Sequence, residues 1–385
     1  MERLEHYAAF LNVDSYGTNA ILVWLLLGSM SVFLLYYVLI FSRLLFFKNK
    51  PKSIKPDPVS VIIASRDDAD RLVAHLPLIM NQKGVTYEVI VVDDCSVDDT
   101  VDVLREYSEK FSNFRTSKLV ESGEFEGGKK YAVTMGIKAA KYPHLVFIDA
   151  DCYPNSENWL RLMAERLMYK KVVLGYGPLK KAPGFLNKLI RYDTFKIAMQ
   201  YLSYSLAGIP YMGVGRNLAY HSYLYFDAKG FTNHLNVVSG DDDLFVNEVS
   251  TAKNTGVEIH SDSFVYSLAK ESYVKWEYQK RRHLTTAPKY KLVHKLLLTL
   301  LPASQYVLNI VFITLLIRGF EIDMVLAIYS VKLIIQGLVQ FFAMRRLKVL
   351  DLFVWSFVME FLLMLFYPWV TLLNFVKEDQ RKRWV

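Results

Sequence analysis

The stretch His144-Leu145-Val146-Phe147-Ile148-Asp149-Ala150-Asp151 decides the fold, because a short apolar run leads directly into two carboxylates. Two earlier runs, Val59–Ala64 and Glu88–Val92, have the same form and also end in polar residues. The segments Asp70–Met80 and Val101–Phe111 show the apolar spacing of helices. Strands that alternate with helices of this length predict βαβ units and a mainly parallel sheet. The predicted fold class is therefore α/β.

Clusters of charged residues follow the predicted strands or precede an apolar segment. In open α/β sheets, ligands bind at the carboxyl ends of the strands, so these positions favour function. The clusters are Asp93-Asp94-Cys95-Ser96, Asp149-Ala150-Asp151, Ser239-Gly240-Asp241-Asp242-Asp243 and Gln279-Lys280-Arg281-Arg282-His283.

Asp149 and Asp151 have the spacing of a site for a divalent cation. Mg²⁺ prefers oxygen ligands and is often held by one or two carboxylates together with substrate phosphates. A metal there would neutralise charge on a diphosphate leaving group. The alternative is an acidic turn that only ends a strand, since turns favour Asp in any case.

The clusters at 239–243 and 279–283 each have a structural alternative as well. Asp241, Asp242 and Asp243 precede an apolar helix start, where an N-cap and first-turn acidic residues are favourable. Three successive carboxylates exceed what a cap requires, and such crowding raises the pKa of a base. Arg281 and Arg282 have the chemistry to bind phosphate oxygens, or to form a basic patch beside anionic lipid.

Apolar residues make up 52% of the 385 residues and are concentrated at the two ends of the chain. The run Ala20–Phe47 exceeds the roughly 20 residues that cross a bilayer. Three further apolar runs follow the α/β region, at Leu296–Ile317, Met324–Phe342 and Leu350–Phe375. The predicted organisation is an extracytoplasmic N-terminus (1–19), a transmembrane helix (20–47), a cytoplasmic catalytic domain (48–291), a C-terminal membrane region (292–376) and a basic tail (377–385).

Basic residues orient the first span. Arg3 is the one basic residue before it, whereas Arg43, Lys48 and three more lysines follow, so the domain after the span is predicted to be cytoplasmic. The net charge of +8 is explained by residues beside the apolar runs and indicates no nucleic-acid partner. If the third C-terminal run crosses the membrane, the basic tail lies outside. A re-entrant or interfacial segment bent near Pro368 keeps that tail inside, and both alternatives remain open.

The clusters, taken in order, resemble the family 2 glycosyltransferases of GT-A fold, which include cellulose, chitin and hyaluronan synthases and ceramide glucosyltransferase. The resemblance covers about Val59 to His283, with membrane segments on both sides. On the donor side it rests on Val59–Asp67 and Val91–Thr100 as nucleotide-binding turns, on Gly128-Lys129-Lys130-Tyr131-Ala132 as the G-K-x-x-A segment and on Asp149-Ala150-Asp151 as the D-x-D motif. On the acceptor side it rests on the segment Gly213–Tyr220 and on Asp241-Asp242 as the E/D-D motif. Gln279 to His283 correspond to the Q-x-x-R-W motif.

The resemblance implies a role for each matching residue. Asp242 is the expected catalytic base, and Asp149 and Asp151 are the expected ligands of Mg²⁺ or Mn²⁺. The residues expected to bind the donor nucleotide are Ala64, Arg66, Asp67, Asp94, Lys129, Asp149 and Arg282. Those expected on the acceptor side are Asn217, Asp241, Gln279 and His283. His283 stands where the family has Trp, a departure that bears on long-chain synthesis more than on the transfer reaction.

The implied function is inverting transfer of a sugar from a nucleotide-diphosphate sugar to a polysaccharide or lipid-linked acceptor in cell-surface glycan synthesis. The protein is expected to be a multi-pass protein of the cell (inner) membrane, in contact with membrane lipids. A homo-oligomer is a further alternative. Two alternatives are a single-addition lipid glycosyltransferase without polymerisation and a catalytically inactive membrane scaffold.

Overall fold

The computed structural model describes residue 17 and residues 19–48, 54–120, 128–237 and 239–376. Most of the predicted N-terminal segment and the whole basic tail therefore lie outside the described residues. The chain divides into two compact units. One comprises residues 1–46 with 292–343, and the other comprises residues 47–291 with 344–385.

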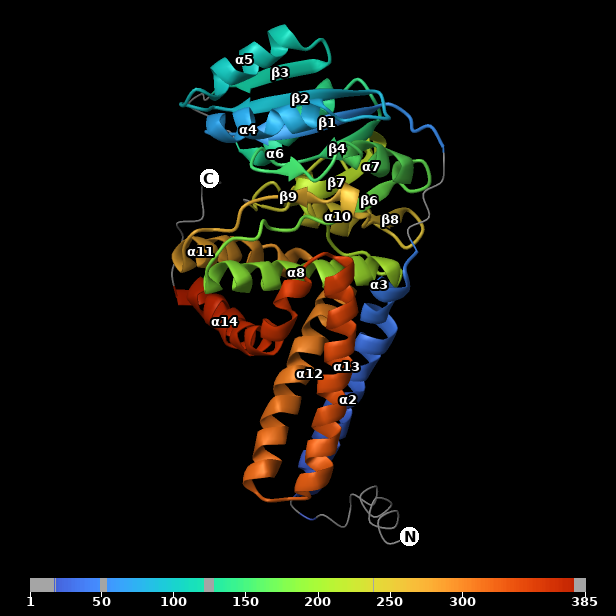
Figure 1. Ribbon diagram of the computed structural model, residues 1–385, viewed down its shortest axis with the longest axis vertical. Coiled ribbons are helices and arrows are strands. Elements are labelled where there is room, and N and C mark those ends of the chain that lie inside the picture. The colour runs from blue at the N-terminus through green and yellow to red at the C-terminus, as the bar shows by residue number, and fades with distance from the viewer. Residues whose placement is uncertain (1–16, 18, 49–53, 121–127, 238, 377–385) are drawn as a thin grey trace. The chain divides into compact units, whose positions relative to one another are not determined.

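A seven-stranded sheet forms the centre of the second unit, with the strand order β3-β2-β1-β4-β7-β6-β8 (Figure 1). The strands are β1 (Val59–Ser65), β2 (Tyr87–Asp94), β3 (Phe114–Leu119), β4 (His144–Phe147), β6 (Val172–Gly175), β7 (Leu218–His221) and β8 (Thr255–Glu258). All pair in parallel except β7, which runs antiparallel to both of its neighbours. The predicted α/β class is confirmed.

Helices cover both faces of this sheet. Alternate residues of β1, such as Val61 and Ile63, belong to a buried apolar cluster that includes residues of α4 (Ala69–Met80), α5 (Thr100–Lys110) and α7 (Trp159–Leu167). Ile62 lies on the opposite face, against α6 (Lys129–Ala139). A Cβ added at Gly136 of α6 would lie 2.6 Å from an Ile62 methyl group, so α6 approaches the sheet closely there.

The reversed direction of β7 determines which loops meet at the site. Because β1, β2 and β4 run in parallel, the residues after them lie along one edge of the sheet. A strand that runs in reverse has its first residues at that same edge. The turn Gly215–Asn217, which leads into β7, therefore lies at the same edge as Asp149, which follows β4.

The rest of the second unit consists of longer helices and short connecting elements. The helices are α8 (Phe185–Leu206), α9 (Ser222–Asp227), α10 (Asp243–Val249), α11 (Tyr273–Leu284) and α14 (Ser356–Val376), the last preceded by a 3₁₀ segment, Leu350–Trp355. A two-stranded sheet pairs β5 (Tyr153–Pro154) with β9 (Val265–Tyr266). Figure 1 shows α14 beside α8 and α11, and α14 contacts both helices.

The first unit contains long apolar helices. A continuous helical stretch runs from α2 (Ala20–Leu35) through a π-helical segment, Tyr36–Phe41, into α3 (Ser42–Phe46). It packs against α12 (Leu292–Ile317), where the Tyr36 hydroxyl donates to the Leu297 carbonyl at 2.7 Å. The helix α13 (Ile322–Arg346) follows α12.

Four helical stretches in the described chain are long and apolar enough to cross a membrane: 20–46, 292–317, 322–346 and 350–376. They coincide with the apolar runs of the sequence to within a few residues. This pattern indicates membrane association.

Candidate active site

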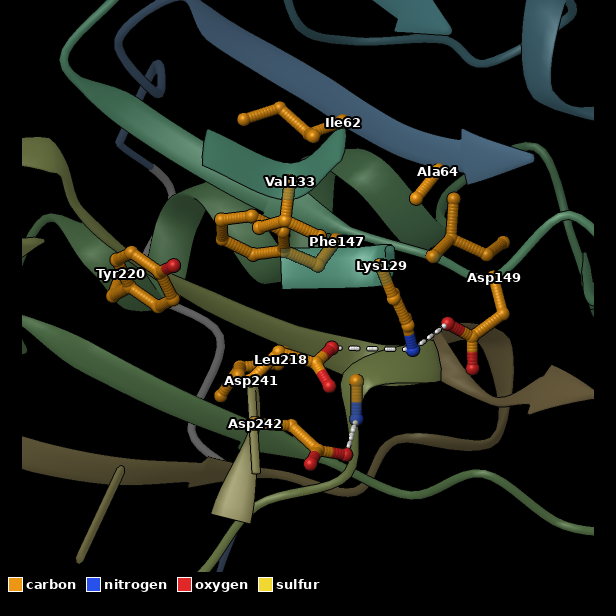
Figure 2. A pocket seen from close by; sticks show the side chains of 12 residues that line it. Ile62, Ala64, Lys129, Val133, Phe147, Asp149, Leu218, Tyr220, Asp241 and Asp242 are labelled. Atoms are coloured by element: carbon orange, nitrogen blue, oxygen red, sulfur yellow. Dashed lines mark hydrogen bonds and ion pairs between the residues drawn. The ribbon is translucent and has the colours of Figure 1, made fainter. Parts of the chain in front are cut away.

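A pocket lies at the carboxyl edge of the central sheet and gathers residues from distant parts of the chain. Figure 2 shows Lys129 between Asp149 and Asp241, with Asp242 beside them. The lining residues are Ile62, Ala64, Lys129, Val133, Phe147, Ile148, Asp149, Gly215, Leu218, Tyr220, Asp241 and Asp242. Five residues predicted for the site thus lie in one pocket: Ala64, Lys129, Asp149, Asp241 and Asp242.

Lys129, the first residue of α6, is the positive centre of this pocket. Its Nζ lies 2.8 Å from Asp149 Oδ1 and 3.2 Å from Asp241 Oδ2. Burial acts to lower the pKa of Lys129, but the neighbouring carboxylates of Asp149, Asp241 and Asp242 outweigh it and raise this pKa well above its usual value. Lys129 is therefore charged at neutral pH and ties the aspartate after β4 to the triplet before α10.

Asp149 is ionised for the complementary reason. Burial opposes its ionisation, but the charge and hydrogen bond of Lys129 outweigh that effect and, with Arg216 and Arg282, lower its pKa. The Asp149 carboxylate thus lies within electrostatic range of two guanidinium groups outside the pocket lining, an arrangement that suits a bound diphosphate and its counter-ion.

The three successive aspartates have three different surroundings. Asp241 pairs with Lys129, whereas Asp243 Oδ2 accepts hydrogen bonds from the Thr286 and Tyr290 hydroxyls at 2.5 and 2.7 Å. Asp242 is the N-cap of α10, and its Oδ1 accepts from the Asp243 amide at 2.7 Å. Its Oδ2 accepts from the Gly215 amide at 2.6 Å. The capping interpretation is therefore correct for Asp242, and it coexists with a place in the pocket.

Asp242 has a pKa far above that of an ordinary aspartate. Burial, followed by repulsion from Asp241 and Asp243, raises its pKa to about 7, although Lys129 and the Gly215 amide act in the opposite direction. A carboxylate with a pKa near neutrality accepts a proton from a hydroxyl far better than an ordinary aspartate does. The repulsion among the three neighbouring carboxylates that the sequence predicts is thus present at Asp242.

The residues after β4 fit a divalent cation. One carboxylate oxygen each from Asp149 and Asp151, together with the Cys152 sulfur, lie within 4.8 Å of one another. The Cys152 thiol donates to Asp151 Oδ1 at 3.1 Å, and burial raises its pKa well above the usual value, so the sulfur stays protonated. The oxygen ligands would thus come from Asp149 and Asp151, and hard cations such as Mg²⁺ and Mn²⁺ match such a donor set.

The predicted donor residues after β1 and β2 adjoin one another. Asp67, at a φ of +51°, accepts a hydrogen bond from the Val97 amide at 2.8 Å. Asp94 is fully buried, and both of its carboxylate oxygens lie 2.9 Å from the Gly128 amide. The Arg66 Nη1 atom lies 3.8 Å from Asp94 Oδ2. Asp94 therefore positions the turn that starts α6, and with it Lys129.

Asn217 differs from its predicted role on the acceptor side. Its side chain is fully buried, and its Oδ1 accepts from the Trp159 indole nitrogen at 3.0 Å. Its Nδ2 donates to the carbonyls of Tyr176 and Ser263, each at 2.8 Å. Because these bonds occupy both ends of the amide, Asn217 links α7, the residue after β6 and the 3₁₀ segment Ser261–Ser263, and its buried amide is engaged within the protein.

Arg216, next to it, is a site residue that the sequence interpretation missed. Its Nε donates to the Gly177 carbonyl at 2.9 Å, and its charge lowers the pKa of Asp149. Arg216 lies within the acceptor-side segment Gly213–Tyr220, but nothing in that segment indicates that its charge acts on Asp149. Because β7 runs antiparallel to its neighbours, the turn before it, which contains Arg216, lies at the edge of the sheet where Asp149 is found.

The helix α11 carries the remaining predicted residues, Gln279, Arg282 and His283, none of which lines the pocket itself. Arg282 nevertheless lowers the pKa of Asp149. Its buried Nε has no hydrogen-bond partner among the described residues, so this donor is available to a ligand. Desolvation, followed by repulsion from Lys280 and Arg282, lowers the pKa of His283 well below its usual value, so the ring is neutral at pH 7.

An α/β domain with acidic residues at the carboxyl edge of its sheet has the arrangement that many nucleotide-using enzymes share. Residues 60–215 match the model of glycosyl transferase family 2, and this segment belongs to that family. The expected GT-A fold is confirmed. A mannosyltransferase from Pyrobaculum calidifontis, solved with GDP-Man and Mn²⁺, has a TM-score of 0.58 at 17% identity, over 94% of this chain and 99% of that one.

Sequence relatives agree on the family over shorter segments. A poly(ribitol-phosphate) β-glucosyltransferase from Bacillus spizizenii is 32% identical over 105 residues, which is 27% of this chain and 16% of that protein. A 4,4'-diaponeurosporenoate glycosyltransferase from Staphylococcus haemolyticus is 32% identical over 122 residues, 32% of each chain. The match therefore spans a third or less of these relatives' length, and they are named for different acceptors.

Proposed function

We propose that this protein is a membrane-bound, inverting glycosyltransferase that moves a sugar from a nucleotide-diphosphate sugar to a glycan or lipid-linked acceptor. The single observation that carries this proposal is the convergence of Asp149, Lys129 and Asp242 in one pocket. The Lys129–Asp149 pair suits a diphosphate and its counter-ion. Asp242, whose pKa is about 7, lies in the same pocket.

Asp242 would remove the proton from the acceptor hydroxyl as that oxygen attacks the anomeric carbon. The Gly215 amide, 2.6 Å from Asp242 Oδ2, would keep the carboxylate oriented during transfer. Asp241 would assist on the acceptor side, and Gln279 and His283 would line that side from α11. Attack opposite the leaving nucleoside diphosphate inverts the anomeric centre.

On the donor side, Asp149 and Asp151 would hold Mg²⁺ or Mn²⁺, which supplies positive charge for the departing diphosphate. Arg282 and Arg216 would add charge there, because both already act electrostatically on Asp149. Ala64, Arg66 and Asp67 would contact the nucleoside. Asp94 would act indirectly, through the turn at Gly128.

The apolar helices support a proposal for the acceptor and the location. We place the protein in the cell (inner) membrane with the catalytic domain cytoplasmic, because basic residues follow the first apolar helix. A hydroxyl on a lipid-linked or growing glycan at that membrane would then be within reach. Single addition to a lipid and synthesis of a surface polysaccharide, alone or as a homo-oligomer, are both consistent with this chemistry.

The test is a donor screen. The purified full-length protein in detergent or lipid is given a panel of nucleotide sugars with Mg²⁺ or Mn²⁺, and release of nucleoside diphosphate is measured. We expect release with one donor class, and a loss of about 10²–10⁴-fold in Asp242→Asn, the usual effect of removing a general base. Full activity in Asp242→Asn would overturn the base assignment. Absence of turnover with every donor and acceptor would support the scaffold alternative.

A further inference from the structure

The loop 232–240, described except at residue 238, ends directly before the aspartate triplet 241–243. It begins with a 3₁₀ turn, Thr232–His234, and its middle runs over the surface, where Leu235 is 51% exposed. The chain enters the triplet from this loop. Whatever holds the loop therefore also helps to set the positions of Asp241 and Asp242 in the pocket.

Lys130, the second residue of α6, holds this loop from inside the protein. Its Nζ donates to the His234 carbonyl at 2.5 Å and to the Val237 carbonyl at 2.7 Å, and the residue is 6% exposed. A hydrogen bond from an ammonium group is charge-assisted, and it is stronger still where water is excluded. Because the two acceptors are three residues apart, one side chain fixes the middle of the loop at two points.

The buried charge of Lys130 makes opening of the loop unfavourable. Burial lowers the pKa of Lys130 to about 8, whereas the carboxylates of Asp241, Asp243 and Asp242 act in the opposite direction, so the group is mostly protonated at pH 7. If the loop moved away, the ammonium would lose both carbonyl acceptors in the interior, and a buried donor without its partner is costly. The loop is therefore held by that cost as well as by the bonds themselves.

Contacts at the two ends of the loop differ in kind from the contact at its middle. Near the start, Asn233 Nδ2 donates to Glu248 Oε1 of α10 at 2.6 Å in an exposed position. At the end, Gly240 has a φ of +102°, and a Cβ there would lie 2.5 Å from a Leu244 methyl carbon. Between these ends, Lys130 connects the loop to a different helix through buried bonds.

Two consecutive lysines at the start of α6 bind the loop and the triplet that follows it. Lys129 pairs with Asp241 at 3.2 Å, as Figure 2 shows, whereas Lys130 binds the loop carbonyls. Successive residues of a helix point about 100° apart, so the two side chains reach different parts of one segment. The Gly128 amide just before them is bonded to Asp94. The start of α6 is thus fixed on the donor side and in turn fixes the chain that carries Asp242.

We propose that Lys130 is a positioning residue for the transfer reaction, which holds the loop 232–240 in place so that Asp241 and Asp242 stay in the pocket. It acts through backbone carbonyls and touches no reacting atom. In the G-K-x-x-A segment Lys130 occupies an x position, so the motif assigns it no role. A misplacement of about 1 Å can reduce a reaction rate about 10²-fold. The effect on transfer rests on the proposed function, whereas the attachment of the loop does not.

The experiment compares full-length Lys130→Met and Lys130→Arg with the unsubstituted protein in detergent. Hydrogen–deuterium exchange, read by mass spectrometry, measures the protection of peptides from the loop 232–240 and from β1. With the donor and acceptor that the donor screen identifies, turnover gives kcat and the acceptor KM, and binding of the nucleoside diphosphate is measured separately. Lys138→Met is the matched control, because it makes the same change at an exposed position of α6.

In Lys130→Met we expect the loop peptides to exchange about tenfold faster while the β1 peptides stay protected. The ratio kcat/KM for the acceptor should fall about 10–100-fold, with the affinity for nucleoside diphosphate unchanged. Lys130→Arg keeps a charged donor in an altered geometry and should show smaller changes of the same kind. It decides the question alone if Lys130→Met does not fold. Lys138→Met should match the unsubstituted protein.

Unchanged exchange of the loop peptides would overturn the proposal. Equally fast exchange of the β1 peptides would overturn it too, because Lys130 would then support the whole unit. Faster loop exchange with an unchanged kcat/KM would rule out the positioning role. If the unsubstituted protein turns over no donor, the proposed function fails, and loop exchange alone then shows whether Lys130 holds the loop.

Discussion

At the residue scale, neighbouring residues of one chemical type have different roles. Asp241, Asp242 and Asp243 are consecutive, yet one pairs with Lys129, one caps α10 and borders the pocket, and one anchors Thr286 and Tyr290. The backbone produces this difference, because the chain turns into a helix within these three residues and points each side chain elsewhere.

The pH dependence of turnover should report Asp242. A base must be ionised, and the pKa of Asp242 is about 7, so kcat/KM should rise with pH and level off above that value. Asp241→Asn removes a negative neighbour and should move the rise to lower pH by about one unit. Lys129→Met removes a positive neighbour and should move it to higher pH.

The control is Glu271→Gln, whose side chain is 86% exposed and which should leave the profile in place. Shifts of the same sign in Asp241→Asn and Lys129→Met would mean that the rise reports another group.

Metal binding should depend on Asp151 and not on the adjacent thiol. Asp151→Asn removes a carboxylate ligand and should weaken Mn²⁺ binding by about tenfold or more. Cys152→Ser should bind Mn²⁺ as the unsubstituted chain does, because Mn²⁺ prefers the oxygen ligands that Asp149 and Asp151 supply. Titration of the Mn²⁺ electron paramagnetic resonance signal with nucleoside diphosphate present measures this directly. The exposed Asp102→Asn serves as the surface control. Equal weakening in Cys152→Ser would assign a ligand role to the sulfur.

At the element scale, the sequence predicted what depends on local pattern. The runs Val59–Ala64, Glu88–Val92 and His144–Ile148 became β1, β2 and β4 with boundaries shifted by no more than two residues. Apolar periodicity and the polar residues after each strand were sufficient for that. The reversal of β7 was not predictable, because strand direction depends on pairing with residues far away in the chain. The roles of Arg216 and Asn217 follow from that reversal and were missed for the same reason.

Asn217 should therefore behave as a structural residue. Asn217→Ala would remove the partner of the Trp159 indole nitrogen and of the Ser263 carbonyl, whereas the Tyr176 carbonyl would keep its bond from the Val265 amide. Each such buried group costs about 1–3 kcal/mol, so the midpoint of thermal unfolding should fall by several degrees. Asn233→Ala, which removes an exposed bond to Glu248, should change stability by about 0.5 kcal/mol or less. An unchanged midpoint with a higher acceptor KM in Asn217→Ala would restore the predicted acceptor role.

At the scale of the whole molecule, hydropathy alone does not distinguish a membrane crossing from a helix fastened to a domain. The segment 350–376 passes the same length and composition test as the helix 292–317. The segment 350–376 differs from the helix 292–317 in a few polar residues that bond to α8 and α11. These residues are Asp351, Glu360 and Asn374. Those partners lie more than 90 residues away in the chain, so the sequence left crossing and interfacial alternatives open at this segment.

One buried ion pair should couple these helices. Lys280 of α11 pairs with Asp193 of α8, which also accepts from the Tyr367 hydroxyl of α14. The Asp193 side chain is 1% exposed and that of Lys280 is 8% exposed, so either charge left alone is unsatisfied in the interior. Asp193→Asn and Lys280→Met should each destabilise the protein by about 3–5 kcal/mol, measured as unfolding of the full chain in detergent.

The double variant should regain much of that loss, because removing both partners leaves no unpaired charge. In the single variants we also expect a higher KM for the donor, since Arg282 lies on the same helix as Lys280. Additive losses in the double variant would show that the two side chains act independently, and that α11 is positioned by other contacts.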